Sequence, residues 1–258
     1  CALTRISGYL VSACPHCGAH YRRPSYSSMN FMAQEQWTDG HTEGSLMPRS
    51  EFMRLCTGCK SIYNVQDLVD AHEIPNEDLY TVYEEPAPPP KTALQKAWRA
   101  ISGELPPQVH RVLRDDLPPY VEYVPDSECQ AYLDGLLAMP SNTAHHALFE
   151  FELRRRLWQQ GNHWYRPDYL AVRKAKGPQP PAWSVSNEQL KHLERLLELL
   201  GDGDLGRGDE LLTVEVLRQL RRFDEATKVL EAITSDSHWN DYQAMLIKNR
   251  MSHVGLYP

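Results

Sequence analysis

Four of the six cysteines form two pairs with the spacing of metal ligands. Cys14 pairs with Cys17 and Cys56 with Cys59, each with two residues between the members. Two sulfur atoms at this spacing on a tight turn can face one ion, so two such turns supply four thiolates for a tetrahedral zinc site. Four thiolates leave no position for a reactive water, so we expect one Zn²⁺ with a structural role.

The residues around the cysteines favour tight turns. Pro15 restricts φ in the first pair, and Gly18 and Gly58 allow the positive φ that such turns need. The pairs are separated by 38 residues, where about 15–20 is common in zinc sites of this kind. We therefore expect the insert to form its own loop or hairpin on the metal-binding part. His16 and His20 flank the first pair, and either imidazole could replace a cysteine as a zinc ligand. Because four thiolates already complete the tetrahedron, we expect both histidines to lie beside the ligands or to be exposed.

Residues 5–66 resemble a zinc ribbon, a small β-sheet module with one metal-binding turn in each of two hairpins. The resemblance rests on Ala13-Cys14-Pro15-His16-Cys17-Gly18 and Leu55-Cys56-Thr57-Gly58-Cys59-Lys60, with strand-like runs at 5–12, 52–55 and 61–65. It implies a β fold held by zinc. Proteins with such ribbons bind nucleic acid, bind protein or use the metal only for stability, so the resemblance does not assign a function.

The other two cysteines have different contexts. Cys129 shares an apolar helical stripe with Leu133, Leu136 and Leu137, which predicts a buried, unreactive thiol. Cys1 has two interpretations: the lipid-bearing first residue of a mature bacterial lipoprotein, or the start of a trimmed chain. Because reduced zinc thiolates fit a reducing compartment, we expect a bacterial-type cytoplasm.

The net charge and the length of the apolar runs argue against two classes of function. The 258 residues carry 27 Lys and Arg against 34 Asp and Glu, a net charge of −7. This acidity argues against a general phosphate binder, and the apolar runs are too short for a membrane span. The basic exception is the region 141–182, with seven basic residues against three acidic ones.

Proline-rich stretches at 84–90 and 177–181 divide the chain. We predict a zinc ribbon with a long loop between its metal-binding turns at 1–83. A helical region follows at 91–258, in sub-parts 91–176 and 182–258. The predicted fold class is α+β: a small N-terminal β zinc ribbon followed by a mostly α-helical region.

The helical region shows apolar residues at helical spacing, with recognisable helix starts and stops. Ser186 and Gln189 form a capping-box signature. Residues 219–226 resemble the turn of a tetratricopeptide unit, with Phe223 and Ala226 at its packing positions, but no clear second copy occurs. The whole layout resembles uncharacterised bacterial zinc-ribbon proteins. Helices are predicted at 92–101, 127–138, 142–160, 186–200, 209–220, 223–233 and 237–251.

A segment rich in basic and aromatic residues is the candidate binding surface. Such a mixture can hold single-stranded nucleic acid, and it also occurs at protein interfaces. A third interpretation is that the aromatics are core or hinge residues and the arginines pair with nearby glutamates. The candidate binding residues are Arg154, Arg155, Arg156, Trp158, Trp164, Tyr165 and Arg166.

A neighbouring group, His146 with Glu150, has helical spacing for a second metal or for an ordinary polar face. Phosphate-binding loops, dinucleotide fingerprints and nucleophile elbows are missing from the sequence. We therefore predict a non-enzymatic protein-interaction or adaptor module whose partner is another protein. The alternative is a nucleic-acid-binding zinc-ribbon protein that uses the region 141–182. A third hypothesis is an enzyme with a scattered site using His145, His146 or His163.

Overall fold

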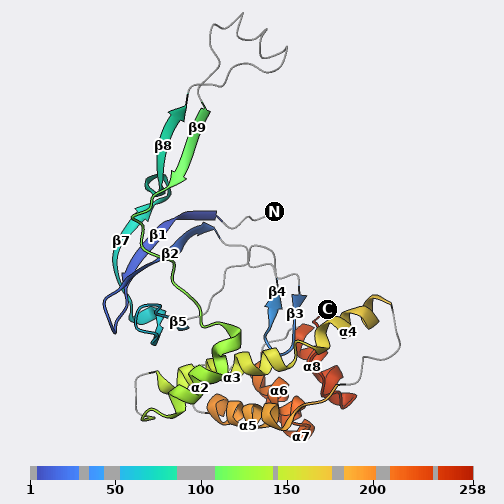
Figure 1. Ribbon diagram of the computed structural model, residues 1–258. Coiled ribbons are helices and arrows are strands. Elements are labelled where there is room, and N and C mark those ends of the chain that lie inside the picture. The colour runs from blue at the N-terminus through green and yellow to red at the C-terminus, as the bar shows by residue number, and fades with distance from the viewer. Residues whose placement is uncertain are drawn as a thin grey trace, which may run out of the picture. The chain divides into compact units, whose positions relative to one another are not determined.

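The computed structural model has the predicted α+β order, with strands first and helices after (Figure 1). The chain divides into two compact units, which we call the ribbon unit (1–29 and 55–122) and the helical unit (30–54 and 123–258). The structure describes residues 5–28, 35–43, 53–85, 108–141, 145–175, 183–201, 210–234 and 238–257.

Several predictions concern residues outside these ranges: Cys1, the helix at 92–101, the prolines at 86–90 and the stretch 177–181. The prediction that 1–83 and 91–258 fold as separate domains stays a prediction. The two compact units divide the chain differently, because the 30–54 segment between the cysteine pairs belongs to the helical unit.

A three-stranded antiparallel sheet is the base of the ribbon unit. The strand β1 (Arg5–Ala13) lies between β2 (His20–Ser28) and β7 (Val69–Pro75). The sequence pattern predicts β1 but neither β2 nor β7. Gly8 is required where β7 approaches, since a Cβ there would lie 2.6 Å from the carbonyl oxygen of Ile74.

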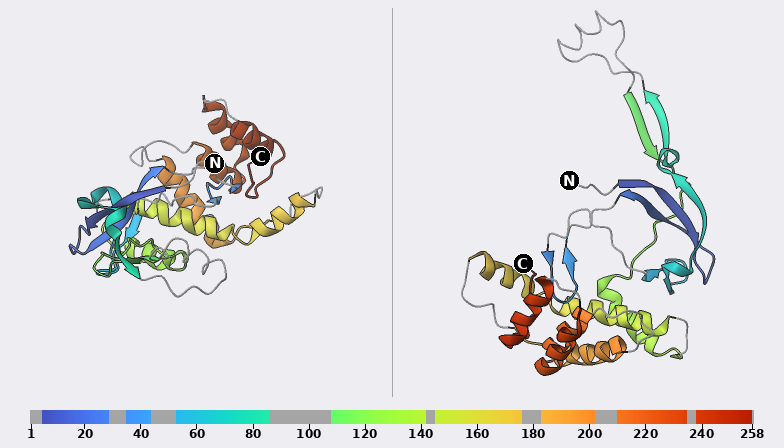
Figure 2. Two further views of the ribbon diagram at one scale, coloured as in Figure 1. Left: turned by 90° about the horizontal axis from the view of Figure 1, so that it is seen from above. Right: turned by 180° about the vertical axis from the view of Figure 1, so that it is seen from behind.

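Two further hairpins complete the strands of this part of the fold. The strands β5 (Met53–Leu55) and β6 (Ile62–Asn64) pair on either side of the second cysteine pair, as predicted. A short 3₁₀ turn, Asn76–Leu79, leads into β8 (Tyr80–Glu85), which pairs with β9 (Gln108–Leu113). Figure 2 shows this β8–β9 ribbon running on beyond the three-stranded sheet.

The helical unit also contains a small hairpin of β3 (Glu35–Gln36) and β4 (Thr42–Glu43). The described helices correspond to the predicted ones except α4, which falls in the basic and aromatic segment. The capping box is confirmed: the Ser186 hydroxyl accepts from the Gln189 amide and the Gln189 side chain accepts from the Ser186 amide, both at 3.1 Å. The helices are α2 (Cys129–Leu137), α3 (His146–Gly161), α4 (Tyr165–Lys174), α5 (Asn187–Gly201), α6 (Glu210–Gln219), α7 (Phe223–Ala232) and α8 (His238–Lys248).

Helix α6 carries two apolar cores on different faces. Leu212 and Val216 pack with Trp158 of α3 and with leucines of α5. Val214 and Leu217 pack in a second cluster with residues of α7 and α8. Each fully buried aliphatic side chain contributes about 1.5–3 kcal/mol, so apolar burial accounts for much of this unit's stability.

The α6–α7 turn lacks the glycine that helix ends usually use. Arg221 takes the left-handed conformation instead, with φ of 61°, at a cost of about 1–2 kcal/mol for a residue with a Cβ. The amide of Arg222 bonds to the Leu217 carbonyl at 2.9 Å and closes the helix. Phe223 and Ala226 are both buried. The resemblance to a tetratricopeptide unit stays a prediction.

Helices in the described part of the chain are too short or too polar to cross a membrane.

Candidate metal centre

The two cysteine pairs come together at one point of the ribbon unit. Their four sulfur atoms lie within 4.8 Å of one another. The Sγ atoms of Cys14 and Cys59 are 4.0 Å apart, and those of Cys17 and Cys56 are 3.6 Å apart. Zinc–sulfur bonds of about 2.3 Å in a tetrahedron place the sulfurs roughly 3.8 Å apart, so the geometry suits a tetrahedral thiolate site such as that of zinc.

Both metal-binding turns have the same backbone design. In the first, the Cys14 amide bonds to the Ala19 carbonyl at 2.8 Å; in the second, the Cys56 amide bonds to the Ser61 carbonyl at 3.0 Å. The amides of His16 and Cys59 each lie 3.4 Å from the first sulfur of their own turn. N–H groups directed at sulfur stabilise the thiolate form that a metal requires.

The positive φ that each turn needs lies directly after its second cysteine. Gly18 has φ of 73° and Lys60 has φ of 59°. The prediction is right for Gly18 and wrong for Gly58. A Cβ at position 58 would make ordinary van der Waals contacts, 3.5 Å from the Tyr21 hydroxyl and 3.6 Å from the Cys56 sulfur, so neither φ nor space requires glycine there.

Tyr21 of β2 connects the two halves of the centre. It is buried, and its hydroxyl lies 3.2 Å from the Cys56 sulfur and 3.0 Å from the Thr57 hydroxyl. The Gly58 amide donates to the same oxygen at 3.1 Å. Tyr21 therefore orients the second turn through three contacts, as outer partners of metal ligands commonly do. Its role was not predicted from the sequence.

The environment of Cys56 favours its ionised form. Burial raises the pKa of this thiol, but hydrogen bonds from Tyr21 and from the Cys59 amide outweigh burial and lower the pKa to about 6. A thiol that ionises near neutral pH is ready to bind a metal. His16 is exposed and its Nε2 lies 3.3 Å from the Ile62 carbonyl, so its ring links the first turn to β6; His20 is exposed as well.

The arginine run of α3 is engaged in ion pairs. Arg154 bonds to Glu150 at 2.8 Å and Arg155 to Glu152 at 2.9 Å. Arg156 is buried against Asp126 and the carbonyl of Val124. These pairs are the contacts expected from the third interpretation of the segment, in which nearby carboxylates hold the arginines.

Most of the aromatic members are core residues. Trp158 is fully buried and donates from Nε1 to Gln219 at 2.9 Å. Tyr165 is also fully buried, while Trp164 is 49% exposed. Arg166 is 4% exposed and bonds to Asp39 at 2.6 Å. Of the seven candidate binding residues, Trp164 is therefore the one with a large exposed side chain.

The neighbouring histidines do not assemble a second metal site with Glu150. His146 is buried with its Nε2 at 3.1 Å from the Leu136 carbonyl, and Glu150 also binds Arg195 at 3.0 Å. Within the described ranges, the four cysteines are the one group of three or more such side chains close enough to share an ion. Cys129 is buried with its sulfur 3.6 Å from the Pro125 carbonyl, as predicted.

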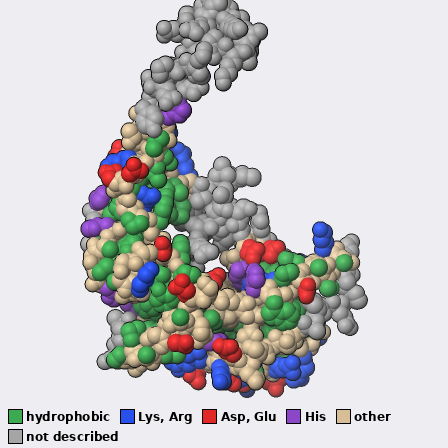
Figure 3. Space-filling view, viewed as in Figure 1, with side chains coloured by type: hydrophobic (Ala, Val, Ile, Leu, Met, Phe, Trp, Pro, Cys, Tyr) green, Lys and Arg blue, Asp and Glu red, His purple; other side chains and the backbone are tan. Residues whose placement is uncertain are grey.

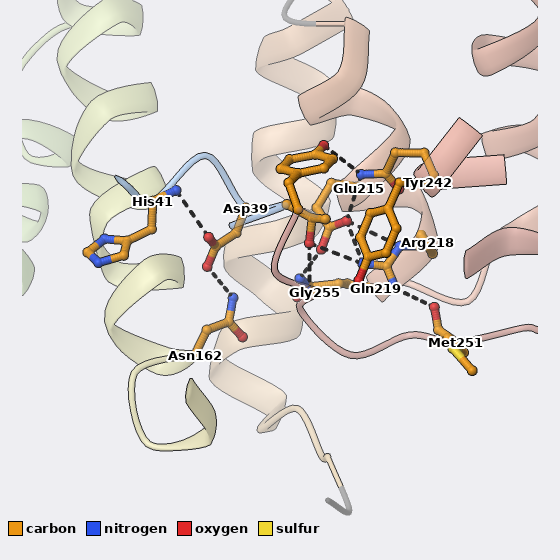
Figure 4. Close-up of polar contacts among 12 residues, drawn as sticks. Asp39, His41, Asn162, Glu215, Arg218, Gln219, Tyr242, Met251 and Gly255 are labelled. Atoms are coloured by element: carbon orange, nitrogen blue, oxygen red, sulfur yellow. Dashed lines mark hydrogen bonds and ion pairs between the residues drawn. The ribbon is translucent and has the colours of Figure 1, made fainter. Parts of the chain in front are cut away.

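The 35–43 part of the insert between the cysteine pairs forms a hairpin, as expected, but this hairpin belongs to the helical unit, whereas β2 at the start of the insert lies in the sheet of the ribbon unit. The turn residue Asp39 is fully buried and accepts from Asn162 at 2.9 Å (Figure 4). It also accepts from Arg166. Gln159 donates to the Asp39 carbonyl at 2.9 Å. The hairpin packs here because the buried Asp39 carboxylate needs polar partners, and residues at α3 and α4 supply them.

A second buried polar cluster lies beside α6. Glu215 and Arg218 are both fully buried and are bonded at 3.1 Å through Nε of the arginine. Gln219 and Gln243 donate to the same glutamate at 2.6 and 3.2 Å, and Arg218 also reaches the Met251 carbonyl (Figure 4). Neither this cluster nor the role of Asp39 was predicted from the sequence. The feature of the sequence that could have indicated this cluster is the presence of two charged residues, Glu215 and Arg218, beside the apolar residues Val214, Val216 and Leu217.

Comparison of the chain with protein-family models, with curated proteins and with solved structures gave no match. The four-cysteine geometry, which is consistent with a zinc ribbon, therefore stands on the structure alone.

Proposed function

We propose that this protein is a non-enzymatic protein-interaction module whose ribbon unit is held together by one structural zinc ion. The metal is assigned a structural role because all four tetrahedral positions are taken by cysteine, which leaves none for substrate or water. Cys14, Cys17, Cys56 and Cys59 would bind the ion. Zinc would supply folding free energy rather than chemistry.

One observation supports the interaction role: the β8–β9 ribbon exposes apolar side chains. Tyr80 lies opposite Leu113, and Val82 lies opposite Arg111, two residues further along the same face. Tyr80, Val82, Val109 and Leu113 are 37%, 54%, 57% and 42% exposed, and hydrophobic side chains are visible on this ribbon in Figure 3. A two-stranded hairpin alone is at best marginally stable in water, so a covering partner would stabilise it.

The chemistry of the ribbon defines the partner. Within the described residues β8 and β9 pair with each other alone, so their outer edges offer backbone hydrogen-bonding groups to a further strand. Arg111 lies on the same face, and no ion pair joins it to a side chain that the structure describes. The proposed partner is an extended segment of another protein, with apolar side chains at alternate positions and one acidic side chain for Arg111.

Site-specific photo-crosslinking in the native host tests this proposal. A photoreactive residue at Val109 should capture one partner protein, whereas the same residue at Met245, which is 39% exposed on α8, should not. With the purified partner, Val82→Lys and Arg111→Glu should each weaken binding at least about tenfold, or 1.4 kcal/mol. Equal capture from Val109 and Met245, or unchanged affinity in both variants, would contradict the proposal.

Nucleic-acid binding through 141–182 receives no comparable support, because its three consecutive arginines are paired with carboxylates. The alternative keeps a simple test. Replacing Arg154, Arg155 and Arg156 by Glu would abolish salt-sensitive RNA or DNA binding if that surface were used.

A further inference from the structure

A pocket of about 470 Å³ lies between α2, α3 and α5 of the helical unit. This volume is in the range of small-molecule sites. Apolar and charged side chains from all three helices meet there, and none of them belongs to the metal centre or to the β8–β9 ribbon. The pocket is lined by Gln130, Leu133, Leu137, Arg154, Asn187, Glu188, Lys191 and His192.

His192 provides the most specific group in the pocket. The residue is only 7% exposed, and its Nδ1 lies 3.2 Å from an Nη atom of Arg154. Arginine has donors and no acceptor, so Nδ1 must accept, and the proton of the neutral ring is on Nε2. Burial and the Arg154 charge lower the pKa of His192, which favours this neutral ring. No described residue bonds to Nε2, so it remains as a donor for a ligand.

The pocket carries charges of both signs that are not paired with each other. Lys191 and Glu188 are exposed, both line the pocket, and neither makes an ion pair with a described residue. Asp134 and Glu188 both act electrostatically on His192. Arg154 adds a positive charge, although it shares Glu150 with Arg195. A ligand with a single strong charge would therefore meet repulsion from one group or another, whereas a ligand with both charges would not.

An apolar surface lies next to these charges. Leu133 is 1% exposed, and Leu137, one turn further along α2, is 48% exposed. The helical stripe predicts that Leu137 faces inward with its neighbours, but this side chain lies at the pocket. An aliphatic group of the ligand that covers Leu137 would remove apolar area from water.

We propose that this pocket binds a small zwitterion with an aliphatic body, of the class of free α-amino acids with branched aliphatic side chains. The carboxylate is received by Lys191 and the Nε2–H of His192, whose ring Arg154 holds from the Nδ1 side. The ammonium group faces Glu188, and the side chain lies on Leu133 and Leu137. No bond is made or broken in this proposal, so the site is one of recognition.

Isothermal titration of the zinc-loaded full chain with four probes tests the ligand class. L-leucine should bind at concentrations below about 10 mM. L-leucinamide lacks the carboxylate, N-acetyl-L-leucine lacks the ammonium group and glycine lacks the aliphatic body. L-leucinamide and N-acetyl-L-leucine should each bind at least about tenfold more weakly, since a lost charged hydrogen bond is worth roughly 1.5–3 kcal/mol. Glycine should also bind at least about tenfold more weakly, because it covers none of the apolar surface. N-acetyl-L-leucine binding as tightly as L-leucine would overturn the proposal.

Substitutions of exposed residues test whether L-leucine binds in this pocket, and they should not disturb the fold. Lys191→Met and Glu188→Gln should each weaken L-leucine binding at least about tenfold. Lys228→Met, which changes an exposed lysine of α7, should leave the affinity unchanged. Absence of L-leucine binding, or equal affinity in Lys191→Met, Glu188→Gln and Lys228→Met, would overturn the assignment of this site.

Discussion

The ribbon unit and the helical unit stabilise their buried polar groups in different ways. In the ribbon unit the buried core around the cysteines is small, with Cys14, Tyr21, Cys56 and Tyr63 as its buried members. Two of these, Cys14 and Cys56, are proposed metal ligands, and Tyr21 contacts the Cys56 sulfur. In the helical unit the apolar cores are continuous with ion pairs such as Glu215–Arg218, which need no external component.

This difference predicts which change should destabilise each unit. A unit whose core consists of ligand groups has unpaired thiols when the metal is absent, so its stability depends on an ion. A unit with internal ion pairs instead depends on keeping both partners, because removing one leaves a buried charge without compensation. The two units should therefore respond to different perturbations, and each of the following experiments uses one unit as the control for the other.

Loss of one metal ligand should have the largest effect. Cys56→Ser should abolish tight metal binding and remove the folding contribution of about 10–16 kcal/mol that structural zinc provides. Hydrogen exchange should rise throughout 5–28 and 55–75 and remain unchanged in α5–α8. Cys129→Ala, which removes a thiol outside the metal centre, is the control. Equal protection of the ribbon unit in Cys56→Ser and in the native chain would show that the cysteines do not hold a structural metal.

Breaking the buried ion pair should be the next largest effect, now in the helical unit. Arg218→Met leaves Glu215 charged and buried, which costs about 3–5 kcal/mol. The midpoint of chemical denaturation should fall, with metal content unchanged. Arg222→Met is the matched control, because Arg222 pairs with Glu225 at the surface, where an ion pair contributes about 0–1 kcal/mol. Similar losses in the two variants would refute the role of the buried cluster.

Acid should destabilise the helical unit through His253. Burial, with the Arg218 charge, lowers the pKa of this histidine from 6.5 to about 4. The unfolded chain therefore binds the proton more readily between these values, so stability falls as pH drops from about 6.5 to 4, by up to roughly 3 kcal/mol. Denaturation followed at pH 7 and pH 5 should show this slope. His253→Gln should reduce it, and His238→Gln at an exposed position of α8 should not; equal slopes in both variants would contradict the assignment.

The smallest effect concerns tuning of the metal centre. Tyr21→Phe removes the hydroxyl that contacts Cys56 and Thr57, and zinc affinity measured by chelator competition should fall roughly 10–100-fold. Tyr9→Phe is the control, because the Tyr9 hydroxyl bonds to Tyr120 and not to the cysteine turns. If the two variants bind zinc equally well, Tyr21 contributes only packing.

A feature of the structure can be predicted from the sequence when the residues that form it are close together in the chain. The cysteine pairs, the capping box and the α6–α7 hairpin are all predictable, because their spacing is set within a few residues. Tyr21 and Asp39 are not, since their partners lie 35 and 123 residues away in the chain. The basic run of α3 shows a related limit: the sequence shows the charge of Arg154 but not whether a carboxylate already neutralises it. Helix α4 is hard to predict because its aromatics, interpreted as a surface, are largely core.

Native mass spectrometry of freshly prepared, reduced protein tests the central claim most directly. One zinc per chain should be present in the native protein and absent from Cys56→Ser, with no change in Cys129→Ala. A native chain without metal, or a Cys56→Ser chain that retains zinc at full occupancy, would contradict the assignment of Cys14, Cys17, Cys56 and Cys59 as the structural zinc centre.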